Sequence, residues 1–288
     1  TLTSRSGQPI ESIRRCTIAM YPGREADIDT SLVIEVNQPV NLETLLESLQ
    51  VSAGRTADGQ TIFAGDSAQT DAYYFLPAEL ESKLISRYAV GSIARIREVA
   101  EGEGSAILLS RNLRSLWDHG NAEADIVAMS PSSFLFADGR MLLQSSLPEV
   151  IGSLKSFLSP DVSAGILVAC LDADHAYAEI RLLPSGGTNA AMLQQRIRDA
   201  IRNWPSWADQ FLIEAQPDPS WRLLAARLPL MIRFATNHCR FGASDGAAVA
   251  NVYLPRRIIP QFSMAVSMAL NTPRDVAPSV DDSTPQTA

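Results

Sequence analysis

The tightest cluster of side chains that could bind a metal ion or transfer a proton consists of Asp172, Asp174 and His175. Carboxylates and imidazole serve both as metal ligands and as general acid–base groups. A metal site needs about three or four converging ligands, and this short run supplies at most two on one side. Asp is also a favoured turn residue, because its side chain accepts hydrogen bonds from nearby backbone amides. We therefore expect an exposed hairpin turn here, and keep a metal site as the alternative.

A second candidate is the sequence Gly-Ala-Ser-Asp-Gly at residues 242–246, which fits the G-x-S-x-G pattern of α/β-hydrolases. In those enzymes the serine lies between a strand and a helix, and the histidine of the triad follows it in the chain. Here the motif is predicted to join a helix to a strand, and all three histidines precede Ser244. The sequence favours a glycine-rich turn, with a hydrolase that uses Ser244 as the alternative.

The neighbouring residues His238 and Cys239 could in principle form a thiolate–imidazole pair. Neighbours on a helix point about 100° apart, so the two side chains are not expected to face each other. We predict that Cys239 is a small buried apolar residue. We predict that His238 is a cation near the C-terminal end of a helix, where it interacts with the helix dipole.

Three arginines, Arg222, Arg233 and Arg240, are the candidate binding residues. They are eleven and seven residues apart, which places them on one face if the helix continues through Pro229 to residue 240. No Asp or Glu occurs between residues 221 and 240, although the formal net charge of the chain is −8. The stripe is either a solvated face that pairs with acidic residues of other elements or a docking surface for an acidic protein partner or an anionic head group.

The composition excludes several classes of protein. A pI near 5.0 gives no global positive field that would attract nucleic acid. No apolar run reaches the roughly 18 residues of a membrane span. The three cysteines are scattered and do not form the dense pattern of a disulfide scaffold. No phosphate-binding or dinucleotide-binding motif is complete, so we expect no cofactor.

The elements that must position these residues repeat along the chain. Residues 16–21 and 31–36 are predicted to be strands, and apolar and polar residues alternate along the second of them. Asn41 then begins a helix with leucines spaced along one face. The same order recurs as strands at 165–171 and 177–183 and a helix at 189–204. We predict an α+β fold with mostly antiparallel sheets, helices packed on one face and two duplicated strand–strand–helix units.

The domain prediction follows from this repeat. We expect a disordered lead at residues 1–12, a first α+β module at 13–160, a second module at 161–271 and a disordered tail at 272–288, which is rich in Pro, Ser, Thr and Asp. The chain begins at Thr1 with a polar segment that lacks the features of a signal peptide. We therefore expect a processed chain or a segment of a larger protein.

Several of these segments carry a resemblance. Residues 18–21, 32–36, 39–42, 61–66 and 88–91 resemble domains of uncharacterised bacterial proteins, mostly planctomycete, that are built from repeated strand–strand–helix units. The resemblance covers about the first two thirds of the chain, and its motifs are structural. It implies a non-enzymatic domain, often part of a larger envelope-tethered protein, and it assigns no catalytic residue.

These observations leave three hypotheses for function. The first is a non-catalytic interaction or scaffold domain in an envelope-associated bacterial protein, which predicts that the structure contains no deep polar pocket with perturbed titratable groups. The second is a hydrolase or metal-dependent enzyme that uses Ser244 or the cluster of Asp172, Asp174 and His175, which requires a cleft that joins them to partners from other elements. The third is a small-ligand binder that uses the concave face of a sheet, which a large apolar pocket would favour.

Overall fold

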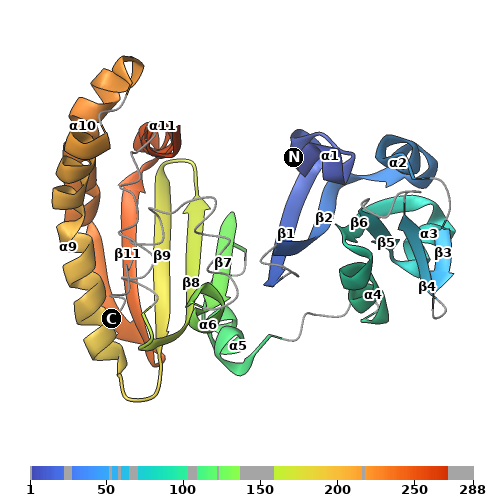
Figure 1. Ribbon diagram of the computed structural model, residues 1–288, viewed down its shortest axis with the longest axis horizontal. Coiled ribbons are helices and arrows are strands. Elements are labelled where there is room, and N and C mark those ends of the chain that lie inside the picture. Colours follow the sequence, from blue (N-terminus) through green and yellow to red (C-terminus); the bar gives the residue numbers. More distant parts are fainter. Residues whose placement is uncertain are drawn as a thin grey trace, which may run out of the picture. The chain divides into compact units, whose positions relative to one another are not determined.

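The computed structural model describes residues 2–22, 28–51, 54–57, 60–64, 71–102, 109–121, 123–136, 159–215 and 218–271. The chain forms two compact units, each built around one antiparallel sheet (Figure 1). The first unit comprises residues 1–108 and 137–142, and the second comprises 109–136 and 143–288. The α+β class and the antiparallel sheets predicted from the sequence are confirmed.

The first unit contains a six-stranded sheet with the strand order β1-β2-β6-β5-β4-β3. Its elements are α1 (Leu2–Ser6), the 3-10 helix η1 (Ile10–Ser12), β1 (Ile13–Pro22), β2 (Ile28–Asn41), α2 (Leu42–Leu49), β3 (Gly54–Ala57), β4 (Gln60–Ala64), β5 (Ala72–Phe75), α3 (Pro77–Ser82), β6 (Leu84–Gly91) and α4 (Ile93–Glu101).

Local sequence explains how the helices of the first unit begin and where they pack. The Asn41 side chain accepts hydrogen bonds from the first turn of α2, and Ser92 caps α4 in the same way. Successive residues of β2 point to opposite faces, so Leu32 packs on the side of α2 whereas Val33 packs on the side of α4. The sheet is thus covered on both faces.

The second unit contains a five-stranded sheet with the order β10-β11-β9-β8-β7. Its elements are α5 (Arg111–Asp118), β7 (Ile126–Pro131), α6 (Ser132–Phe136), β8 (Val162–Leu171), β9 (His175–Pro184), α9 (Ala190–Ala215), η3 (Pro219–Trp221), α10 (Arg222–Asn237), β10 (Cys239–Ser244), β11 (Ala247–Pro255), η4 (Arg256–Ile258) and α11 (Ile259–Asn271).

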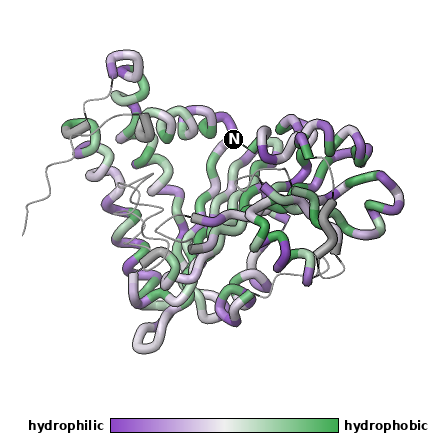
Figure 2. Tube along the Cα trace, turned by 45° about the vertical axis from the view of Figure 1, so that its right-hand side comes forward, coloured by the Kyte–Doolittle hydropathy of each residue, from purple (hydrophilic) through white to green (hydrophobic). Residues whose placement is uncertain are grey.

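The long helix α9 organises the second unit. Its N-terminal half packs Leu193, Ile197 and Ile201 against the sheet, and its C-terminal half joins α10 and α11 around Phe211 and Met268. The shorter helix α5 covers the opposite face of the sheet. In Figure 2 hydrophobic and hydrophilic residues alternate along the helices, as a structure with one buried side per helix requires.

The predicted strand–strand–helix order is present in both units, as β1-β2-α2 and as β8-β9-α9. Leu45 and Ile197, which define the apolar stripes of the two predicted helices, both lie in helices and are buried. Strand β10 is a difference from the prediction, which placed only a turn between the helix and the final strand. Helix α10 runs through Pro229 as one element.

The unit boundary also differs from the sequence prediction. The prediction placed the junction near residue 160, whereas the units divide between Leu108 and Leu109 because β7 pairs with β8 along its whole length. The side-chain pattern of β7 does not reveal which sheet it joins, since strand pairing depends on contacts distant in sequence. The second unit therefore includes residues 109–136.

The N-terminal lead is ordered from Leu2 onward, contrary to the prediction for residues 1–12. Arg5 donates two hydrogen bonds to Asp71, at 2.8 and 2.7 Å, and Ser6 is completely buried. The Tyr88 hydroxyl donates to the backbone oxygen of Ser6. Leu2 also packs against the hydrophobic core of the first unit, and Arg5 donates to Thr30 at 2.8 Å, so partners distant in sequence hold the mostly polar lead in place. The predicted tail at 272–288 lies outside the described residues.

No helix within the described ranges is long and apolar enough to cross a membrane.

Candidate functional site

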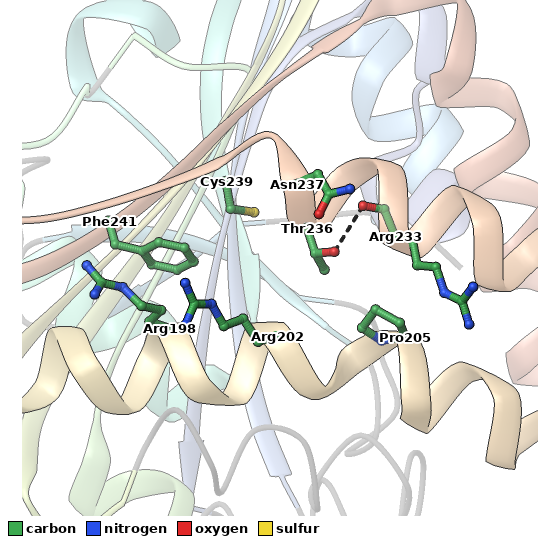
Figure 3. A pocket seen from close by; sticks show the side chains of 8 residues that line it. All are labelled: Arg198, Arg202, Pro205, Arg233, Thr236, Asn237, Cys239 and Phe241. Atoms are coloured by element: carbon green, nitrogen blue, oxygen red, sulfur yellow. Dashed lines mark hydrogen bonds between the residues drawn. The ribbon is translucent and has the colours of Figure 1, made fainter.

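The second unit contains a pocket of about 540 Å³ between α9 and the junction of α10 with β10 (Figure 3). Helix α9 supplies part of its wall, the C-terminal end of α10 supplies another part, and β10 supplies a third. The lining residues are Arg198, Arg202, Pro205, Arg233, Thr236, Asn237, Cys239 and Phe241. The pocket size falls within the range of about 300–1,000 Å³ that is usual for ligand sites.

The spacing of residues on α9 directs two arginines into this pocket. Arg198 and Arg202 are four residues apart and so lie on the same face of the helix. Ile197 precedes Arg198 and Ile201 precedes Arg202, and both isoleucines pack against the sheet. Figure 3 shows Arg198 and Arg202 side by side and pointing toward β10, whereas the guanidinium group of Arg233 points away from them.

The pocket carries an excess of positive charge. The Arg198 guanidinium lies over the Phe241 ring, 5.6 Å from its centre, which is a cation–π contact worth about 0.5–1 kcal/mol. Neither Arg198 nor Arg202 forms an ion pair with a described carboxylate. Arg233 pairs with Asp209 at 3.2 Å, and both side chains are about half exposed. Two neighbouring guanidinium groups repel each other, and a bound anion would relieve that repulsion.

The one thiol in the pocket is not activated as a nucleophile. Burial raises the pKa of Cys239, so the thiol stays neutral, and its sulfur donates to the Ala235 oxygen at 3.4 Å. The His238 ring lies tilted against the Phe234 ring with 4.2 Å between ring centres, and its Nδ1 lies 2.7 Å from the Phe234 carbonyl oxygen. Among the described residues the pocket thus holds charged binding groups but no paired nucleophile and base.

The three arginines of the predicted stripe do not share one face. Helix α10 ends at Asn237, and Arg240 lies on β10 between two residues that line the pocket, Cys239 and Phe241. Because side chains alternate along a strand, Arg240 points to the other face of the sheet. Arg222 and Arg233 remain on one side of α10, and only Arg233 reaches the pocket.

Arg198 and Arg202 were missed from the sequence because they lie more than thirty residues before Arg233. Their four-residue spacing beside an apolar stripe was the available signal, but it is also typical of any solvated helix face. The packing of α10 against α9 turns that face into one wall of a pocket.

The predicted cluster of Asp172, Asp174 and His175 forms the turn between β8 and β9. One carboxylate oxygen of Asp172 accepts from the amides of Asp174, at 2.8 Å, and His175. These hydrogen bonds lower the pKa of the exposed Asp172 carboxyl, and the bond from the His175 amide has the larger effect. Arg256 donates to the backbone oxygens of Asp172 and Asp174. No group of three or more potential metal ligands occurs in the described residues.

We expect metal ions to leave the stability of this turn unchanged. For the wild-type protein and for Asp174→Asn alike, the Tm should be the same with chelator as with added divalent cations, because two backbone amides occupy one oxygen of the Asp172 carboxylate and no third potential ligand converges on it among the described residues. A cation-dependent rise in Tm that Asp174→Asn abolishes would establish the metal site instead.

Ser244 also lies at a turn, but between two strands. Asp245 and Gly246 both have positive φ, 53° and 76°, as in the two-residue hairpin turn that favours Asp-Gly. The Ser244 hydroxyl donates to the Asp245 carboxylate at 2.7 Å. His238 precedes the opposite end of β10, about 20 Å away at the usual rise of a strand. The structure does not bring these two residues together.

Comparisons with known proteins give no family assignment. No family model and no curated protein matches the sequence. Among solved structures, crystal form III of TP0453 aligns with 86% of this chain and 79% of that chain, at 10% identity and a TM-score of 0.39. Crystal form I of TP0453 aligns with 88% and 79%, at 9% identity and the same TM-score of 0.39. At this TM-score neither structure bears on the function of the chain.

Proposed function

We propose that this chain is a non-catalytic interaction domain that binds an acidic protein partner in the arginine-lined pocket of the second unit. The observation that carries the proposal is the pair Arg198 and Arg202, which line the pocket without a described carboxylate partner. A protein of net charge −8 repels acidic partners over most of its surface, so a local cluster of arginines sets where such a partner docks.

The two alternatives from the sequence have different support. The enzyme hypothesis needs a general base at Ser244 or further metal ligands at the Asp172 turn; the Ser244 hydroxyl bonds the Asp245 carboxylate, no histidine lies beside it, and the described residues contain no group of three potential metal ligands. The small-ligand hypothesis is favoured by the volume of the same pocket, about 540 Å³, but not by its lining, which includes three arginines where that hypothesis expects mainly apolar side chains. A small dicarboxylate would then occupy the arginines in place of an acidic side chain of a protein. The bacterial, envelope-associated origin implied by the resemblance stays a prediction.

The proposal is tested with a fluorescent peptide of glutamate, glycine and serine that has no apolar residue. We expect the peptide to bind, and its affinity to fall as salt rises, because screening weakens charge pairing. Arg202→Glu should weaken binding about tenfold or more, which corresponds to about 1.4 kcal/mol. Arg202 is exposed and unpaired among the described side chains, so this substitution should not destabilise the fold.

The matched control is Arg97→Glu on α4 of the first unit, which makes the same change in net charge at an exposed arginine. Equal weakening by both variants would mean that only net charge matters, and would contradict a site in the pocket. Succinate binding to the pocket with no binding of the peptide would favour the small-ligand alternative. Absence of binding by either probe would refute the proposal.

A further inference from the structure

Helix α10 exposes an apolar ridge that the fold of the second unit does not use. Leu223, Leu230 and Phe234 are 79%, 65% and 41% exposed. They are seven and four residues apart, so they lie within about 20° of one line along the helix. The other side of α10 packs Leu224, Leu228, Met231 and their neighbours against α9 and α11. Single exposed apolar residues are ordinary, but three aligned on one helix form a continuous surface.

Arginines flank this ridge on both sides. Arg227 lies about 40° to one side of the line, and Arg222 and Arg233 lie about 80–100° to the other. Helix α10 contains no Asp or Glu, and neither Arg222 nor Arg227 has an ion pair with a described carboxylate, whereas Arg233 pairs with Asp209 of α9 at 3.2 Å. Arg233 also lines the pocket, so one of the arginines that flank the ridge belongs to both places.

The shape of the ridge selects a helix as its occupant. The line from Leu223 to Phe234 runs parallel to the axis of α10 for about 16 Å, at 1.5 Å per residue. Ala226 is exposed between Leu223 and Leu230, and its small side chain leaves room for a second helix to approach. A second copy of the chain paired through α10 would set arginine against arginine, which disfavours self-association.

We propose that the acidic partner presents an amphipathic α-helix, whose apolar side packs on the ridge and whose carboxylates face Arg222, Arg227 and Arg233. This inference rests on the proposed function and names the class of partner. Such a helix carries apolar residues every three or four positions with Asp or Glu beside them, the pattern that recurs in helix-in-groove recognition. Apolar contact then supplies affinity, and the arginines select the charge and the orientation of the partner.

The test uses two acidic peptides of identical composition, one with leucines at every third or fourth position and one with the same leucines scrambled. We expect the amphipathic peptide to bind at least tenfold more tightly than the scrambled one. Leu230→Ser should remove that difference while leaving the binding of the glutamate–glycine–serine peptide unchanged. The matched control is Leu84→Ser, at a leucine of the first unit that is 52% exposed. Both leucines are exposed, so both variants should fold.

The outcomes separate this inference from the proposed function. Equal affinity for the amphipathic and the scrambled peptides, with Arg202→Glu still weakening both, would overturn the helical partner and leave the acidic partner standing. A protein that is dimeric in solution and becomes monomeric in Leu230→Ser would assign the ridge to a second copy. Co-sedimentation with anionic lipid vesicles in place of peptide binding would assign it to a membrane surface. Either of the last two results would overturn the inference.

Discussion

Truncation of Phe75 to alanine is expected to lower the free energy of unfolding of the first unit by about 3–5 kcal/mol. Phe75 is completely buried, and its ring meets Phe63 edge-to-face with 5.2 Å between centres and lies 5.8 Å from the Tyr88 ring. Removal of the ring leaves a cavity at the middle of the sheet that these neighbours cannot fill without leaving their own positions. Denaturant unfolding followed by far-ultraviolet circular dichroism measures the loss.

The tryptophans provide an internal control for this prediction. All four, Trp117, Trp204, Trp207 and Trp221, belong to the second unit. Each unit has its own core, so the tryptophan fluorescence transition should keep its midpoint in Phe75→Ala while the transition of the first unit shifts. Phe75→Leu, which leaves a smaller cavity, should give a smaller shift. If the tryptophan transition shifted by the same amount as the transition of the first unit, the two units would unfold as one.

Replacement of Glu179 by alanine is expected to destabilise the second unit by about 2–4 kcal/mol. The Glu179 side chain is only 9% exposed, accepts from Arg181 Nε at 2.6 Å and accepts from the Tyr177 hydroxyl. Without the Glu179 carboxylate, the mostly buried guanidinium of Arg181 and the hydroxyl of Tyr177 lose their hydrogen-bond partner. The Asp245 carboxylate, 3.9 Å from Arg181, would then be the nearest described negative charge. Tryptophan fluorescence in denaturant measures the change, and Glu179→Gln, which keeps an acceptor, should lose less.

The same cluster predicts a pH dependence. Burial, and then the hydrogen bond to Glu179, raise the pKa of Tyr177 well above its ordinary value. A tyrosine whose folded pKa is raised contributes stability that is complete below pH 10, about its unfolded pKa, and is lost as pH rises toward the folded value. The loss of stability above pH 10 should be shallower in Glu179→Ala, because one cause of the raised pKa is gone. An unchanged alkaline slope would contradict this coupling.

The candidate site shows how far sequence patterns extend. Arg233 was identified because α10 has no acidic residue, a feature visible in the sequence. Arg240 was assigned to the same face because the predicted helix was extended past Asn237. The Asp-Gly turn at 245–246 marks a hairpin, and a hairpin requires a strand before the turn, which is β10. The four-residue spacing of Arg198 and Arg202 is typical of any solvated helix face, so it does not single them out. Only the packing of α9 against α10 and β10 shows that they line a pocket.

The sequence by itself determined the local elements. Strand alternation, the Asn41 cap and the stripe through Ile197 predicted strand–strand–helix twice, because these signals depend on residues a few positions apart. Tertiary structure alone decided that β7 belongs to the second sheet, that Arg5 anchors the lead to Asp71, and that three arginines share one pocket. Each of these features joins residues at least 31 positions apart in the chain, and no periodicity along a sequence encodes which distant segments pack together.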